Sequence, residues 1–175
     1  PDITIIFTNY RDLRLNNLQI DSNDNIKKRV NETVGEYVSL WRRIQQSSKS
    51  YIIQNNADLP AYRVLGNYEG TFLQGNINLL RNYNMKLVES VEPGVAIFDL
   101  DYISSLIGKS KWHDLRYWYH SKHAFLPDVT GLVAFEMSKL IGAVKGLSKK
   151  CVVLDLDNTL WGGIIGDDGL EGIIL

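Results

Sequence analysis

The sequence lacks several features that mark special classes of protein. It has one cysteine, Cys151, so an intrachain disulfide is excluded, and the apolar run around this residue predicts a buried, reduced thiol. Its net charge of −1 lacks the basic excess of a nucleic-acid-binding protein. No apolar run approaches the ~20 residues needed to cross a bilayer, and the first residues show no signal-peptide pattern. We therefore expect a cytoplasmic protein with neither a nucleic-acid nor a membrane partner.

Strand-like and helix-like segments alternate along the 175 residues. Runs rich in β-branched residues predict strands, and apolar residues at helical spacing predict helices. The strands are expected at 3–8, 50–56, 95–100 and 151–156, and the helices at 26–44, 73–90 and 128–144. This alternation predicts an α/β fold, in which helices sandwich a parallel sheet in a flavodoxin-like, three-layer arrangement.

Polar residues follow each of the four predicted strands. In open parallel sheets, functional residues gather in the crevice at the carboxyl ends of the strands. The residues expected there are Thr8 and Asn9, then Gln54, Asn55 and Asn56, then Asp99 and Asp101, and finally Asp155 and Asp157.

The last pair, Asp155 and Asp157, points most clearly to chemistry. Asp155 follows a strand that we expect to be buried on both faces, so its carboxylate would be partly desolvated and would need a cation or hydrogen bonds. A second carboxylate nearby adds repulsion, which Mg²⁺ would relieve. An EF-hand loop does not fit, because Leu160 and Gly166 stand where its glycine and its last glutamate belong. We therefore expect a Mg²⁺ site formed by Asp155 and Asp157.

The segment "VVLDLDNTLWGG" resembles the first motif of the haloacid dehalogenase-like (HAD) superfamily. The longer run "KKCVVLDLDNTLWGGIIGDDGLEGI", residues 149–173, is similar to the FkbH-like branch, subfamily IIIC, of HAD phosphatases. The resemblance implies that Asp155 is the nucleophile that accepts a phosphoryl group. It implies that Asp157 acts first as general acid and then as base, and helps to hold Mg²⁺ through its backbone carbonyl. Thr159 would steady the loop.

The same resemblance implies that residues 149–175 are the first strand and flap of a truncated, Rossmann-like HAD domain. The flap is expected as a hairpin over 164–173, in which Asp167, Asp168 and Glu171 do no chemistry. HAD enzymes also need a Ser or Thr, a Lys and further acids from later strands, and Lys149 and Lys150 cannot replace that Lys. We therefore expect this chain alone to be inactive.

Residues 1–148 are expected to form a separate domain. They loosely resemble the N-terminal region of FkbH-like proteins, whose fold is similar to SGNH hydrolases. The catalytic residues of that fold do not match: no Gly-Asp-Ser is present, "QNN" at 54–56 replaces a Gly-x-Asn-Asp block, and His120 stands where an Asp should precede His123.

The remaining polar and aromatic residues of this region have simpler interpretations. We expect the three histidines, His113, His120 and His123, to be partly exposed, and Asp114 and Arg116 to form a local ion pair. The aromatic residues are expected in the core or at an interface, with Trp118 as a candidate for the crevice; they are Trp112, Tyr117, Trp118 and Tyr119.

Two functions follow from these observations. In the first, the chain is part of a Mg²⁺-dependent phosphohydrolase or phosphotransferase, which acts on a phosphorylated small molecule through an aspartyl-phosphate. Some FkbH-like proteins load a glyceryl group onto an acyl carrier protein. In the second, residues 1–148 are a non-catalytic module that binds a substrate or carrier protein, or a degenerate SGNH esterase.

Overall fold

The computed structural model describes residues 1–13, 15, 23–149, 151–169, 171–172 and 174. Contacts between residues divide the chain into two compact units, Pro1–Ile141 and Gly142–Leu175.

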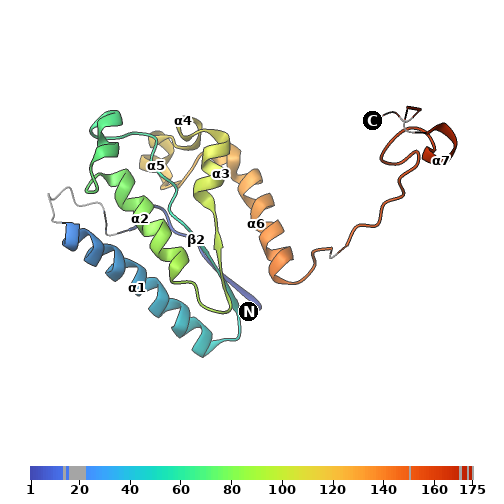
Figure 1. The fold of residues 1–175 in the computed structure, drawn as a ribbon. Coiled ribbons are helices and arrows are strands. Elements are labelled where there is room, and N and C mark those ends of the chain that lie inside the picture. The colour runs from blue at the N-terminus through green and yellow to red at the C-terminus, as the bar shows by residue number, and fades with distance from the viewer. Residues whose placement is uncertain (14, 16–22, 150, 170, 173, 175) are drawn as a thin grey trace. The chain divides into compact units, whose positions relative to one another are not determined.

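The first unit is built on a parallel sheet of three strands, β1 (Ile3–Ile6), β2 (Tyr51–Asn55) and β3 (Val95–Phe98). β2 lies in the centre, so the order is β1-β2-β3 (Figure 1). The register pairs Ile5 with Ile53 and Ile53 with Ala96. These strands confirm the first three of the four predicted from β-branched runs.

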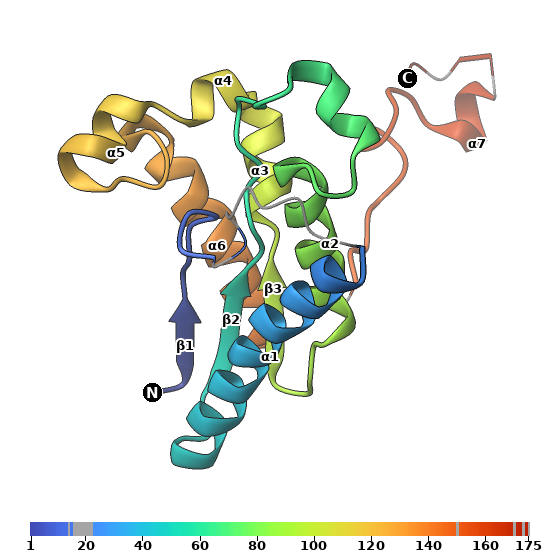
Figure 2. The same ribbon diagram turned by 90° about the vertical axis from the view of Figure 1, so that its left-hand side faces the viewer.

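Helices α1 (Asn23–Ser47) and α2 (Asn76–Glu89) cover one face of this sheet (Figure 2). They confirm the predicted helices at 26–44 and 73–90. Their apolar stripes pack with Ile52 of β2 into one core cluster, which includes the fully buried Trp41 and Leu80. The helical spacing of the apolar residues therefore placed the correct face against the sheet.

The opposite face of the sheet carries a second core cluster. Because side chains alternate along a strand, Ile53 points away from Ile52 and packs with Trp112 and Met137. Four α-helices follow β3: α3 (Leu100–Ile107), α4 (Lys109–Trp112), α5 (Leu115–Ser121) and α6 (Thr130–Val144). Two 3₁₀ turns complete the unit, η1 (Gly66–Thr71) between β2 and α2, and η2 (Pro127–Val129) directly before α6. α3 and α6 complete the second layer of helices, so the predicted three-layer arrangement is confirmed.

The second unit differs from its prediction in three respects. Residues 151–156 are exposed and form no strand in the described part of the chain, and Val153 is 91% exposed. A strand needs neighbours for its backbone groups, and the described residues of this unit offer none. Cys151 is exposed rather than buried. In place of the expected hairpin turn stands a single helical turn, α7 (Ile165–Asp168), although the chain does return antiparallel at Gly162 and Ile174.

None of the helices in the described parts of the chain combines the length and the apolar character that spanning a membrane requires.

Candidate functional site

Side-chain amides join the carboxyl ends of the strands in the first unit. Asn55, the last residue of β2, accepts a hydrogen bond from Thr8 N at 2.7 Å and donates one to Thr8 O at 2.8 Å. Its side chain thus continues the sheet by one rung beyond β1. Gln54 Nε2 reaches Thr8 Oγ1 at 3.3 Å. The predicted gathering of polar residues at this edge is confirmed for β1 and β2.

Asn56 makes the corresponding link between β2 and β3. Its Nδ2 donates to Asp99 Oδ1 at 2.8 Å, and its Oδ1 accepts from Asp101 N at 3.1 Å. Asp101 in turn accepts a hydrogen bond from Leu59 N at 2.9 Å and forms an ion pair with Lys109. These polar residues therefore tie loops and helices together, and their hydrogen-bonding groups are largely used in doing so.

Asp58 is the most deeply buried acid at this edge. Its side chain is 1% exposed, and its Oδ2 accepts a hydrogen bond from Trp112 Nε1 at 2.6 Å. His113 Nε2 lies 3.3 Å from the same oxygen, while His113 Nδ1 lies 3.1 Å from Ala124 O. His113 as a whole residue is partly exposed, as predicted, but its side chain is only 6% exposed.

Burial moves the pKa values of this pair in opposite directions. Desolvation raises the pKa of Asp58 to about 6, although the Trp112 hydrogen bond opposes the change. Desolvation lowers the pKa of His113 to about 4, and the positive charge of Arg11 adds to this effect. Between these values both side chains are neutral. Since Ala124 O can only accept, Nδ1 carries the proton of the imidazole and Nε2 can accept one from Asp58.

The other predicted candidates of this unit have mostly local roles. His120 and His123 are exposed, as expected. Asp114 forms the expected ion pair with Arg116, with Nη2 and Oδ2 2.6 Å apart, and also caps α5. Among the aromatic residues, Trp112 is buried in the core as predicted and Trp118 is half-buried. Tyr117 and Tyr119 are exposed, so they lie outside the core, and the interface that was their other predicted place stays a prediction.

In the second unit, the loop that contains Asp155 and Asp157 is held by its own backbone. Leu156 O accepts hydrogen bonds from the amides of Thr159, Leu160 and Trp161. Asn158 has a positive φ of 55° and exchanges two hydrogen bonds with Gly163, one through its backbone and one through its side chain. Asparagine tolerates this left-handed conformation better than most residues. The sequence therefore specifies the shape of this loop locally.

The two aspartates of the loop differ in how they are held. Asp157 is half-buried, and its Oδ1 accepts hydrogen bonds from Trp161 Nε1 at 3.1 Å and Ile165 N at 3.2 Å. Asp155 is exposed, and its Oδ1 accepts a hydrogen bond from Leu156 N at 2.9 Å. Asp168 accepts from Ile164 N at 2.8 Å, which agrees with a structural role.

The donor chemistry of this loop fits Mg²⁺ as a partial ligand set. The described residues contain no cluster of three or more His, Cys, Asp or Glu that could hold a metal. Mg²⁺ is usually bound in proteins by one or two carboxylates and completes its coordination with water and substrate phosphate oxygens. Asp155 can supply a carboxylate, and Asp157 can supply its carboxylate or its backbone carbonyl.

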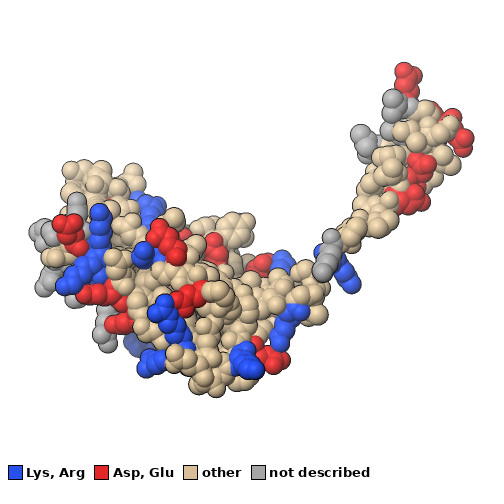
Figure 3. Space-filling model, turned by 60° about the horizontal axis from the view of Figure 1, so that its bottom comes forward, with Lys and Arg blue, Asp and Glu red and all other residues tan. Residues whose placement is uncertain are grey.

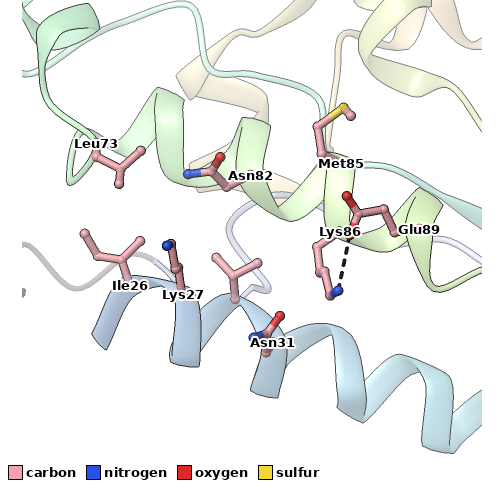
Figure 4. Close-up of a pocket in the computed structure, with 9 residues that line it drawn as sticks. Ile26, Lys27, Asn31, Leu73, Asn82, Met85, Lys86 and Glu89 are labelled. Atoms are coloured by element: carbon pink, nitrogen blue, oxygen red, sulfur yellow. Dashed lines mark hydrogen bonds and ion pairs between the residues drawn. The ribbon is translucent and has the colours of Figure 1, made fainter. Parts of the chain in front are cut away.

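A surface hollow of 370 Å³ lies between α1 and α2 (Figure 4). Lys86 on its wall forms an ion pair with Glu89 at 3.2 Å. On the face of the first unit shown in Figure 3, basic and acidic side chains are interspersed, without a broad patch of one sign. Neither feature provides a catalytic group or a strong electrostatic field.

The fold and the aspartate loop together describe an α/β protein with a parallel sheet and a carboxylate pair suited to Mg²⁺. No protein-family model matches the chain, and no curated protein matches it. A solved structure is similar to it: the crystal structure of the N-terminal part of the protein BF1531 from Bacteroides fragilis, which contains a phosphatase domain complexed with Mg. The two are 27% identical with a TM-score of 0.70, and the similarity covers 99% of this chain and 45% of that one. The chain thus spans less than half the length of the structure it matches.

Sequence reasoning missed Asp58 and Arg11. Asp58 lies three residues beyond the end of β2, in "NNADLP", and its burial depends on Trp112 and His113, which are distant in the sequence. Its position after a strand was the available signal. Arg11 follows β1 at the same edge, and no spacing rule distinguishes it from an ordinary surface arginine.

Proposed function

We propose that the protein is a Mg²⁺-dependent phosphohydrolase or phosphotransferase of the HAD type that acts on a phosphorylated small molecule. The similarity to the Bacteroides structure, which extends over 99% of this chain, carries this proposal. The motif from Asp155 to Thr159 supports it, because it combines two carboxylates and a hydroxyl within five residues.

Asp155 is the proposed nucleophile. Its exposed carboxylate can approach a phosphoryl group from solvent, and attack on phosphorus forms an aspartyl-phosphate as the bond to the leaving oxygen breaks. Asp157 is the proposed general acid, which gives a proton to that oxygen and later takes one from the water that hydrolyses the intermediate. The hydrogen bonds from Trp161 and Ile165 hold the Asp157 side chain in one orientation.

Mg²⁺ would be held by the Asp155 carboxylate and the Asp157 backbone carbonyl, which leaves the Asp157 carboxyl group available for proton transfer. When bound, Mg²⁺ would neutralise the charge that otherwise repels a carboxylate from a phosphate. Thr159 is the proposed supporting residue of the loop, where its amide already donates to Leu156 O at 3.3 Å.

The test uses the longest form of the protein that contains these 175 residues, because the aspartate loop is only part of the set that HAD chemistry needs. We expect hydrolysis of an aryl phosphate that depends on Mg²⁺ and is lost in Asp155→Asn. Asp168→Asn is the matched control, since the Asp168 side chain accepts a hydrogen bond from Ile164 N within its own turn and should not affect turnover. Equal turnover in Asp155→Asn and the unchanged protein would contradict the assignment. The 175-residue chain alone should be inactive.

We further propose that the protein is FkbH-like and cytoplasmic, that the domains are residues 1–148 and 149–175, and that an acyl carrier protein is a partner. The alternative proposal is that the first domain is a non-catalytic binding module and not an SGNH-type esterase. The observation that favours it is that Thr8, the hydroxyl residue after β1, lies among the amides of Gln54 and Asn55. A nucleophile needs a base within hydrogen-bonding distance, and these amides cannot act as one.

A further inference from the structure

A second hollow lies at the carboxyl edge of the sheet in the first unit and has a volume of 560 Å³. Its walls come from the loops after β1 and β2, the first residue of α2, and the segment that joins α4 to α5; several of these elements can be followed in Figure 2. Sites for small molecules commonly have volumes of about 300–1,000 Å³ and combine apolar walls with a few polar groups. This hollow has that size, and its lining is polar and apolar in nearly equal parts.

Arg11 is the cationic group of the hollow. Two aromatic rings hold its guanidinium, with Cζ 4.4 Å from the centroid of Tyr10 and 4.5 Å from that of Trp118. Among the described residues, no carboxylate lies within ion-pair distance of this side chain, and its N–H groups donate no hydrogen bond. A guanidinium that is fixed by stacking keeps its forked donors available for a carboxylate or phosphate.

Neither neighbouring acid, the hollow-lining Asp114 or the buried Asp58, forms an ion pair with Arg11. Asp114 is engaged by Arg116, and Asp58 accepts the hydrogen bond from Trp112 in the protein interior. The positive charge of Arg11 contributes to the low pKa of His113, which lines the same hollow. The imidazole is therefore neutral at pH 7, and Arg11 is the cation of the hollow that lacks an ion-pair partner among the described residues, although the buried Asp58 behind His113 is ionised at this pH.

The hollow also contains an unused acceptor and an apolar wall. Asn76 Oδ1 is buried and has no hydrogen-bond partner in the described part of the chain. A buried polar atom without a partner costs free energy that a ligand with a donor group can recover. Pro60, Ala61 and Leu115 form the apolar side.

We propose that this hollow is a binding site for a small organic anion. The carboxylate or phosphate group of the ligand binds to the Arg11 guanidinium, and its apolar body lies against Pro60, Ala61 and Leu115. This site uses neither Asp155 nor Asp157, so it is independent of the proposed phosphatase chemistry.

Calorimetric titration of the 175-residue chain in the presence of EDTA tests the proposal, because a chelator removes any contribution from Mg²⁺. The probes are phenylacetate and phenyl phosphate, with benzyl alcohol as the uncharged analogue. We expect at least one anion to bind saturably and the alcohol not to bind. The anion that binds more tightly identifies the acidic group that the site prefers.

Three substitutions locate the binding. Arg11→Gln should weaken the affinity for the anion at least tenfold, or about 1.4 kcal/mol. Arg43→Gln, at an exposed arginine of α1 outside the hollow, should leave the affinity unchanged. Asn76→Asp should also weaken binding of the anion, because it places a negative charge in the hollow. This variant should fold, since a carboxylate is favourable in the first turn of a helix.

Arg11→Lys keeps the positive charge but loses the forked N–H donors of the guanidinium, so it should bind the anion more weakly than the unchanged chain. It replaces Arg11→Gln if that variant does not fold. The proposal is overturned if neither anion binds, or if Arg11→Gln and Asn76→Asp bind as tightly as the unchanged chain. It is also overturned if Asp155→Asn removes binding while Arg11→Gln does not, since the anion would then lie at the aspartate loop. Loss of phosphatase turnover alone does not affect it.

Discussion

Folding changes the proton affinity of Asp58 and of His113 in opposite directions. Between pH 3.8 and about 6 the folded state binds more protons at Asp58 than the unfolded state does, so this residue makes stability fall as pH rises. Between about pH 4 and 6.5 the folded state binds fewer protons at His113, so that residue makes stability rise with pH. The two contributions therefore oppose each other over nearly the same range.

Asp58→Asn should expose the contribution of His113. Asparagine can still accept from Trp112 Nε1 through its amide oxygen, so the Trp112 hydrogen bond survives. The same oxygen faces His113 Nε2, as the ionised carboxylate does above pH 6, so the variant loses no hydrogen bond to His113 in that range. We expect the free energy of unfolding of the variant to rise from pH 4 to 6.5, and to exceed that of the unchanged chain above pH 6 by about 1–3 kcal/mol. Urea denaturation at a series of pH values measures both quantities.

Asp114→Asn provides the control for this experiment. Asp114 is half-buried in its ion pair, and the Arg116 hydrogen bond lowers its pKa rather than raising it. The free energy of unfolding of Asp114→Asn, compared with that of the unchanged chain, should not increase as pH rises from 4 to 6. A parallel response of the two variants would show that burial of Asp58 is not the cause.

Two asparagines extend β2 beyond its last rung, and they connect it to different elements. Asn55 pairs with both backbone groups of Thr8, and Asn84 of α2 pairs with both backbone groups of Ala57 at 2.8 Å each. In each case a side-chain amide replaces a strand as the hydrogen-bonding partner. The edge of the sheet is thereby kept open for the loops that line the Arg11 hollow.

We expect Asn55→Ala and Asn84→Ala each to lower the free energy of unfolding by about 2–4 kcal/mol, since each leaves a backbone donor and acceptor without partners. Asn67→Ala, at an exposed position in η1, should change it by less than about 0.5 kcal/mol. Chemical denaturation measures the differences. A loss in Asn67→Ala as large as in the other two would contradict the special role of the paired amides.

The elements of the first unit could be predicted from sequence because their signals are local. Ile26, Val30 and Val34 recur at helical spacing and are all buried in α1. The strand predicted at 151–156 failed because an apolar run becomes a strand only beside other strands. The burial of the His113 side chain could not be predicted either, since it depends on Asp58 and Ala124, and neither partner follows from its own neighbours in the sequence.

Both core clusters consist of residues from the first unit. The cluster on the α1 and α2 face extends in sequence from Tyr10 to Val95, and the cluster on the other face extends from Ile53 to Met137, with Leu140 and Ile141 at its margin. In the second unit, by contrast, the apolar residues between 152 and 156 are about half exposed or more. Burial of apolar surface is the main source of stability in a folded domain.

The first unit should therefore fold without the second. A chain of residues 1–149 keeps α6 and every buried residue of both clusters, so its thermal unfolding midpoint should match that of the 175-residue chain. A chain of residues 1–129 is the control, because it loses Val133 and Met137 and leaves Trp112 without its cover. Loss of large buried side chains costs about 2–5 kcal/mol each, so this shorter chain should unfold at a much lower temperature. Circular dichroism during heating distinguishes the outcomes. An equal loss in both truncated chains would mean that residues 150–175 stabilise the sheet, and that the two compact units fold as one.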